Sequence, residues 1–172
     1  RMVVYPAAAL TAPPLFNEKA MCGLGRGQAP GGALADEAMQ RTIDTLARFA
    51  HLARAMGVTA IDAAATAAVR DADNRQAFLD RILHETGISV RVLSGVEEAR
   101  LSARGVLAAS PGARGLVGDL GGGSLELIQL DPEQENGVGQ GTSLALGTLR
   151  LIADSAGDGA ALDRRIDDAL AQ

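Results

Sequence analysis

Cysteine and histidine are scarce in this sequence, and their scarcity excludes two kinds of site. The single cysteine, Cys22, excludes an internal disulfide bond and gives no sign of an oxidising compartment. The two histidines, His51 and His84, lie in helical patterns, and without a cysteine pair they do not predict a zinc site. We therefore expect a cytoplasmic protein whose histidines are surface or partly buried residues.

Aromatic residues and long apolar runs are also rare. Aromatic residues make up 2% of the chain and tryptophan is absent, which leaves no platform for stacking bases. The net charge of −5 provides no basic stripe for a nucleic acid. No run approaches the roughly twenty apolar residues of a membrane span, and the first residues show no signal peptide. We expect neither a nucleic acid nor a membrane as a partner.

The remaining composition is that of an α/β protein. The 172 residues, of which 47% are hydrophobic, suit one domain plus part of another. Apolar patterns predict strands over residues 2–5, 58–64, 88–93, 115–118 and 142–146, and a helical tail over 160–172. Helices separate the first strands: Asp36, Asn74 and Ser94 are their predicted N-caps, and the helix after Asp36 is predicted to end at Gly57. This alternation implies parallel pairing with right-handed crossovers.

A glycine-rich stretch, Gly121–Ser124, is the most informative segment. The apolar residues before and after it predict two strands joined by a tight hairpin. Glycines let the main chain approach an anion closely, and successive N–H groups in such a turn form a concave anion site. Asp119, at the end of the first strand, offers the oxygen ligands that Mg²⁺ prefers. An ordinary glycine hairpin is the alternative interpretation.

Two adjacent glutamates, Glu97 and Glu98, lie in the first turn of a predicted helix. Ser94 and Glu97 have the spacing of a capping box, which accounts for the first glutamate. Neighbours on a helix point about a hundred degrees apart, so Glu98 faces elsewhere. A carboxylate aimed at a bound phosphate could orient and deprotonate a water molecule. Arg70, Glu98 and Asp119 each follow a predicted strand, so we expect them to share one cleft.

Several segments together resemble the exopolyphosphatase and guanosine pentaphosphate phosphatase family, which belongs to the actin-like ATPase-fold superfamily. The matching segments occur in the family's order and cover residues 65–74, 94–106, 119–127 and 143–151. A glycine-rich stretch over residues 23–27 also lies where family members carry one. The resemblance extends over nearly the whole chain.

The resemblance implies a role for each matching residue. Glu98 would be the catalytic base, Asp119 would belong to the metal and water site, and Arg70 would contact phosphate, a task that suits the fork geometry of a guanidinium. The phosphate loop would consist of Gly121, Gly122, Gly123 and Ser124.

Three other matching residues have structural alternatives. Thr66 is a weaker candidate for a ligand contact, and Asn74 is as well explained as the N-cap of the next helix. Glu126 lies between two leucines, where any half-buried strand shows a polar residue.

The fold implied by the resemblance is an α/β, actin-like (ribonuclease H-like) two-domain fold with mixed sheets and flanking helices. Residues 1–115 would form the first domain, and residues 116–172 would begin the second. The family's first strand and phosphate loop have no counterpart here, and the family's second domain runs past residue 172. We therefore expect a fragment of a longer chain, and its activity in isolation stays open.

The function implied by the resemblance is Mg²⁺-dependent release of the terminal phosphate from inorganic polyphosphate or guanosine pentaphosphate, by a protein that is a homodimer at full length. The sequence does not choose between these substrates. An ATP-using kinase of the same fold would leave Glu97 and Glu98 without a role. A non-enzymatic alternative is a sensor that binds polyphosphate or guanosine tetraphosphate at the same loop.

Overall fold

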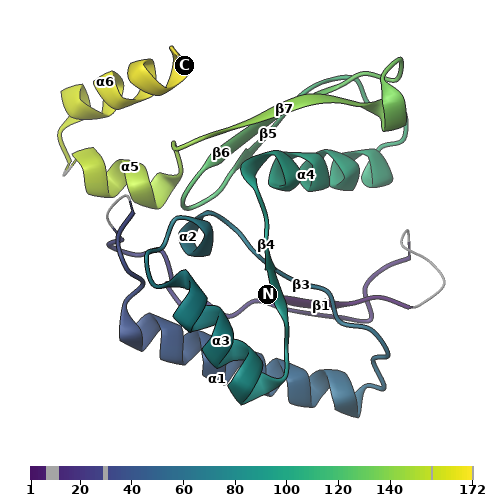
Figure 1. Cartoon of the computed structure of the whole chain (residues 1–172). Coiled ribbons are helices and arrows are strands. Elements are labelled where there is room, and N and C mark those ends of the chain that lie inside the picture. Colours follow the sequence, from purple (N-terminus) through teal and green to yellow (C-terminus); the bar gives the residue numbers. More distant parts are fainter. Residues whose placement is uncertain (7–11, 29–30, 156, 172) are drawn as a thin grey trace.

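The structure, a computed structural model, describes residues 1–6, 12–28, 31–155 and 157–171. Figure 1 shows two helices, residues 36–55 and 75–86, beneath the first strands of the chain. A further helix, residues 95–109, lies beside a sheet that the later strands form. The chain is thus a mixed α/β structure. In chain order its elements are β1 (Met2–Val4), β2 (Phe16–Glu18), α1 (Asp36–Ala55), β3 (Ala63–Ala65), α2 (Ala67–Arg70), α3 (Arg75–Thr86), β4 (Val90–Val92), α4 (Gly95–Ala109), β5 (Gly115–Leu120), β6 (Leu125–Leu130), β7 (Val138–Leu144), α5 (Thr148–Ser155) and α6 (Gly159–Leu170), with a short 3₁₀ turn at Glu135–Gly137.

Helix α1 forms because its apolar residues recur on one face. Met39, Ile43 and Ala50 are buried on that face and pack against α3. The predicted N-cap is wrong by one residue, because Ala35 occupies that position and Asp36 lies in the first turn. An acidic residue there still complements the helix dipole. The predicted end at Gly57 is confirmed, since this glycine has the left-handed φ of +69°.

Asn74 holds the start of α1 rather than capping α3. It occupies the N-cap position of α3, but its side chain makes no capping bond. Instead its Oδ1 accepts from the Leu34 backbone N–H at 2.9 Å, and its Nδ2 donates to the Leu34 carbonyl at 3.0 Å. Asn74 thus occupies the predicted N-cap position, but its side chain bonds the Leu34 backbone and does not cap α3. It therefore links the loop before α1 to the loop before α3.

The strands of the first half are shorter and more varied than predicted. Strands β3 and β4 pair in parallel, as expected, but residues 58–62 lie outside any strand. Strands β1 and β2 form a separate antiparallel pair, and β2 was not predicted. A three-residue strand carries too little alternation to be recognised in a sequence. The expected parallel pairing is therefore confirmed for β3 and β4, whereas β1 pairs antiparallel with β2 instead.

Strands β5, β6 and β7 form an antiparallel sheet covered by α4 (Figure 1). The helix presents two alanines, Ala99 and Ala103, to Ile128 and Leu130 of β6, and all four residues are buried. A Cβ at Gly141 of β7 would lie 2.9 Å from Ile128 Cδ1 and 3.0 Å from Ala99 Cβ. Small residues on both elements therefore allow the helix to lie close to the sheet.

Two helices follow the sheet. The predicted helical tail is confirmed as α6, and Asp158 caps it by accepting from the Ala160 N–H at 2.9 Å. Helix α5 was not predicted; it packs against α6 and begins next to the hairpin between β5 and β6. Within the described residues, no helix is long and apolar enough to cross a membrane.

Candidate active site

The hairpin between β5 and β6 has the tight tip that its glycines predict. The Gly121 N–H donates to the Ser124 carbonyl at 2.9 Å, which closes the turn. The Gly121 and Gly122 carbonyls accept from the N–H groups of Thr148 and Leu149 at the start of α5. Within the described part of the chain, the amides of Gly122, Gly123 and Ser124 donate to no acceptor. The tip therefore has three N–H groups without a protein acceptor among the described residues, and Gly147 packs against the nitrogens of Gly123 and Ser124.

Glycine is required on both sides of this tip. A Cβ at Gly147 would lie 2.2 Å from the Gly123 carbonyl carbon, which is backbone and cannot give way. A Cβ at Gly123 would lie 2.8 Å from the Ala67 Cβ of α2. The hairpin is thus wedged between α2 and the turn before α5, and backbone packs directly on backbone.

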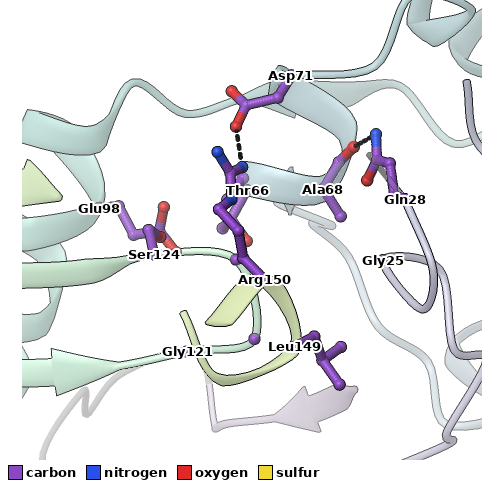
Figure 2. A pocket seen from close by; sticks show the side chains of 13 residues that line it. Gly25, Gln28, Thr66, Ala68, Asp71, Glu98, Gly121, Ser124, Leu149 and Arg150 are labelled. Carbon is purple, nitrogen blue, oxygen red and sulfur yellow. Dashed lines mark hydrogen bonds and ion pairs between the residues drawn. The ribbon is translucent and has the colours of Figure 1, made fainter. Parts of the chain in front are cut away.

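A cavity of about 210 Å³ opens at this junction (Figure 2). It receives residues from the N-terminal glycine loop, α2, α4, the hairpin and α5. The lining consists of Gly25, Gln28, Thr66, Ala67, Ala68, Asp71, Glu98, Gly121, Gly122, Gly123, Ser124, Leu149 and Arg150. All four residues of the predicted phosphate loop, and the predicted base, therefore line one cavity.

Glu98 is directed to the cavity by the capping of α4. The predicted capping box is confirmed, because the Ser94 N–H donates to Glu97 Oε2 at 2.8 Å and the Glu97 N–H donates to Ser94 Oγ at 3.3 Å. The Glu98 side chain, at the next position, is 17% exposed. Its burial raises the pKa of the Glu98 carboxyl, and the buried Glu126 carboxyl adds to that rise.

Arg70 opposes this rise from the other side. Its Nη1 donates to Glu98 Oε2 at 3.1 Å and to the Leu93 carbonyl at 3.0 Å. This hydrogen bond and the guanidinium charge favour the ionised carboxylate, as does a hydrogen bond to Thr66, and they lower the pKa of Glu98 against the effect of burial. Arg70 itself does not line the cavity; it lies behind Glu98.

Glu126 is a functional candidate that sequence reasoning undervalued. Its side chain is 2% exposed, and Ser143 Oγ donates to its Oε1 at 2.7 Å. Along β6 it is in phase with the buried residues Ile128 and Leu130. The period-2 alternation of the strand could have placed this carboxylate on the face toward α4.

Asp119 lies apart from the cavity lining. It is exposed on β5, opposite Glu126 in the strand register, and its Oδ2 accepts a hydrogen bond from Ser102 Oγ of α4. The described residues contain no group of three histidine, cysteine, aspartate or glutamate side chains arranged to hold a metal ion. The structure therefore brings Glu98 and the glycine hairpin together in the cavity, with Arg70 in contact with Glu98 but outside the lining, whereas Asp119 also lies outside it.

Two charged residues of the lining had no assigned role in the sequence. Asp71 ends α2, and its Oδ2 accepts from Arg150 Nη2 of α5 at 2.6 Å. Arg150 lies in the segment 143–151, which resembles the family in sequence, but only the fold places its side chain opposite Asp71. A third polar residue, Gln28, donates to the Ala68 carbonyl at 3.1 Å and holds the N-terminal glycine loop against α2.

The fold and the cavity define a class: a mixed α/β protein with a glycine hairpin, a half-buried carboxylate and paired guanidinium groups around one anion-sized space. The Ppx/GppA phosphatase family matches residues 3–170, and the chain belongs to this family.

Individual relatives agree with this assignment. The chain is 34% identical over 144 residues to exopolyphosphatase 1 of Mycobacterium leprae, covering 82% of this chain and 41% of the relative. It is 34% identical over 155 residues to the guanosine-5'-triphosphate,3'-diphosphate pyrophosphatase of Aliivibrio fischeri, covering 86% and 29% respectively. The crystal structure of an exopolyphosphatase from Cytophaga hutchinsonii superposes with a TM-score of 0.75 at 38% identity, covering 81% of this chain and 45% of that one. The chain thus spans less than half the length of these relatives.

Proposed function

We propose that the protein is a phosphoanhydride hydrolase of actin-like fold that releases the terminal phosphate from inorganic polyphosphate, guanosine pentaphosphate or both. The observation that carries this proposal is the position of Glu98: a half-buried carboxylate lines the same cavity as the free amides of the glycine hairpin. A base and an anion cradle in one cavity are the parts that water attack on phosphorus requires.

Each group has a task in this proposal. The amides of Gly122, Gly123 and Ser124 bind the oxygens of the terminal phosphoryl group. Glu98 orients a water molecule in line with the leaving oxygen and accepts its proton. Arg70 favours the ionised form of Glu98 and adds positive charge near the transferred group. Transition states of this kind need mainly positioning and charge stabilisation. The groups named above supply both kinds of help.

Mg²⁺ is the proposed cofactor, and Asp119 is its proposed ligand. Mg²⁺ is commonly held by one or two carboxylates together with water and substrate phosphates, and Asp119 supplies an exposed carboxylate of this kind. The ion would spread the negative charge of the phosphate groups when bound. Ser102 orients the Asp119 carboxylate through its hydrogen bond.

The test is phosphate release from long-chain polyphosphate and from guanosine pentaphosphate, with and without Mg²⁺, by the natural full-length protein and by Glu98→Gln. Loss of a general base lowers turnover by about 10²- to 10⁴-fold. We expect kcat to fall within this range while KM changes little, because the substitution keeps the shape of the side chain.

Glu97→Gln is the matched control. Glu97 carries the same carboxylate one residue earlier, but its side chain is half exposed and engaged in the capping box, which a glutamine also satisfies. We expect its turnover to match that of the natural protein. Full activity of Glu98→Gln would contradict the assigned base. Tight binding of both substrates by the natural protein without any release would contradict the hydrolase and favour a sensor.

A further inference from the structure

The cavity contains an ion pair that joins two distant parts of the chain. Asp71 and Arg150 are separated by 79 positions, and the Asp71 Oδ2 and Arg150 Nη2 atoms lie 2.6 Å apart. Figure 2 shows the two side chains facing each other across the lining. They are 34% and 17% exposed, so water screens the pair only in part. A short contact between opposite charges in this setting holds the guanidinium in place.

The pair belongs to a line of alternating charges. Asp71 Oδ1 also lies 3.5 Å from Arg70 Nε, and Arg70 Nη1 contacts Glu98. Two guanidinium groups and two carboxylates therefore alternate in one chain of contacts, in which Arg150, Asp71 and Glu98 line the cavity and Arg70 does not, and their formal charges cancel. Among the described residues that line the cavity, the guanidinium that a phosphate meets is Arg150, which is already paired with Asp71. To bind Arg150, the phosphate must take the place of Asp71.

We propose that Asp71 is a positioning residue that competes with phosphate for Arg150 and thereby weakens the binding of the orthophosphate product. The proposal rests on the proposed function, because it treats the cavity as the phosphate site. Because the Asp71–Arg150 pair must separate before a phosphate group can contact Arg150, the pair lowers the affinity for every phosphate ligand by a similar factor. A chain substrate has further contacts that offset this opposition, whereas orthophosphate has few, so Asp71 favours product release.

The test is isothermal titration of inorganic phosphate into the natural full-length protein, Asp71→Asn, Arg150→Gln and the double variant. A partly exposed ion pair is worth up to roughly 1 kcal/mol, so we expect Asp71→Asn to bind phosphate about fivefold more tightly. Asp71→Ala, which also removes the polar contact, should do the same. Thermal melting checks that each variant is folded, and tighter binding is not a result that loss of structure produces.

The double variant distinguishes competition from a general loss of negative charge. If Asp71 acts through Arg150, Asp71→Asn adds no affinity in the Arg150→Gln background. If the carboxylate merely repels phosphate, the fivefold gain persists there, and the proposal is overturned. Asp154→Asn is the matched control, because its partner Arg165 lies 3.3 Å away in a similarly exposed pair outside the cavity lining. We expect this control to bind phosphate as the natural protein does.

Polyphosphate hydrolysis, measured in parallel, separates this proposal from the proposed function. Hydrolysis by the natural protein, without tighter phosphate binding in Asp71→Asn, overturns the role of Asp71 alone. Tighter binding in Asp71→Asn without hydrolysis by any variant supports the role of Asp71 and overturns the hydrolase. Absence of phosphate binding in all variants overturns the role of Asp71 as well.

Discussion

Glu98 is set between neighbours that act on its charge in opposite directions. Burial and the Glu126 carboxyl raise its pKa, while the hydrogen bond and charge of Arg70 lower it. The ionised form of Glu98 is the one that accepts a proton. Burial, Arg70 and Glu126 together therefore set the pH above which the proposed base is active.

This balance predicts opposite shifts in the pH profile. A base is active above its pKa, so kcat/KM rises with pH through the pKa of Glu98. Arg70→Gln removes the group that lowers this pKa, and the rising limb should move to higher pH. Glu126→Gln removes a group that raises it and keeps an oxygen for Ser143, so the limb should move to lower pH. The measurement is kcat/KM against pH for phosphate release.

Arg91→Gln provides the control for this comparison. Arg91 is exposed and pairs with Glu97 rather than Glu98. Its substitution should leave the rising limb where the natural protein has it. A limb that moves in the same direction for Arg70→Gln and Glu126→Gln would refute the assignment of the profile to Glu98.

For single residues, the sequence predicts the chemical role of a side chain better than it predicts which other side chains it contacts. Spacing alone separated Glu97, which caps, from Glu98, which faces the cavity. The sequence did not show that Glu126 is buried, because a glutamate between two leucines fits either face of a strand until the strand is paired. It also did not show that Asp71 meets Arg150, because that contact depends on how α2 and α5 pack together.

The hairpin and helix α5 act together at the scale of elements. The first N–H groups of α5, which have no partner within the helix, are satisfied by the Gly121 and Gly122 carbonyls. The turn before α5 packs through Gly147 on the backbone of Gly123. The anion cradle is therefore held in shape by the start of a helix that contributes Arg150 to the same cavity.

Gly147→Ala should distort this cradle. The added methyl group would overlap the Gly123 peptide, and overpacking against well-packed neighbours costs about 1–3 kcal/mol. We expect a lower free energy of unfolding and weaker binding of tripolyphosphate, measured by urea denaturation and by titration. Gly105→Ala is the control: this exposed glycine in α4 has no heavy atom within 4 Å of an added Cβ, so alanine should stabilise the helix by up to about 1 kcal/mol. Unchanged binding by Gly147→Ala would contradict the role given to this contact.

Long elements were predictable and short ones were not. Helix α1, helix α3 and the hairpin carry strong signals, namely apolar periodicity, glycines after each helix and glycines in the turn. Strand β2 and helix α5 are short, with three and eight residues, so each offers too brief a pattern to be recognised. The alternation of helices and strands predicted the parallel pair of β3 and β4, and the glycine turn predicted the antiparallel pair of β5 and β6. The antiparallel pair of β1 and β2 was not predicted.

The described residues of the molecule contain two separate apolar clusters. One lies between α1, α3 and the strands β3 and β4, and includes Ile82. The other lies between α4 and the sheet of β5–β7, and includes Ile128. Helix α4 therefore packs with the later strands, although the expected domain boundary falls after it. That boundary, at residue 115, stays a prediction.

Two matched substitutions test whether the clusters open independently. Ile82 and Ile128 are 2% and 1% exposed, and shortening a buried isoleucine to valine costs about 0.5–1.5 kcal/mol. Ile82→Val should speed amide hydrogen exchange in α1 and α3, and Ile128→Val should speed it in α4, β6 and β7. Hydrogen-exchange mass spectrometry measures both. If either substitution speeds exchange equally along the whole chain, the two clusters belong to one cooperative unit.

The cavity draws on segments from Gly25 to Arg150, and this spread has a consequence for the order in which the molecule is made. During synthesis, α1, α3 and the first strands leave the ribosome while the wall supplied by Arg150 is still untranslated. The carboxylates of Asp71 and Glu98 thus precede the last cation by many residues. Before α5 emerges and folds onto the hairpin, the two carboxylates have Arg70 as their cationic neighbour, and Arg150 then completes the line of alternating charges.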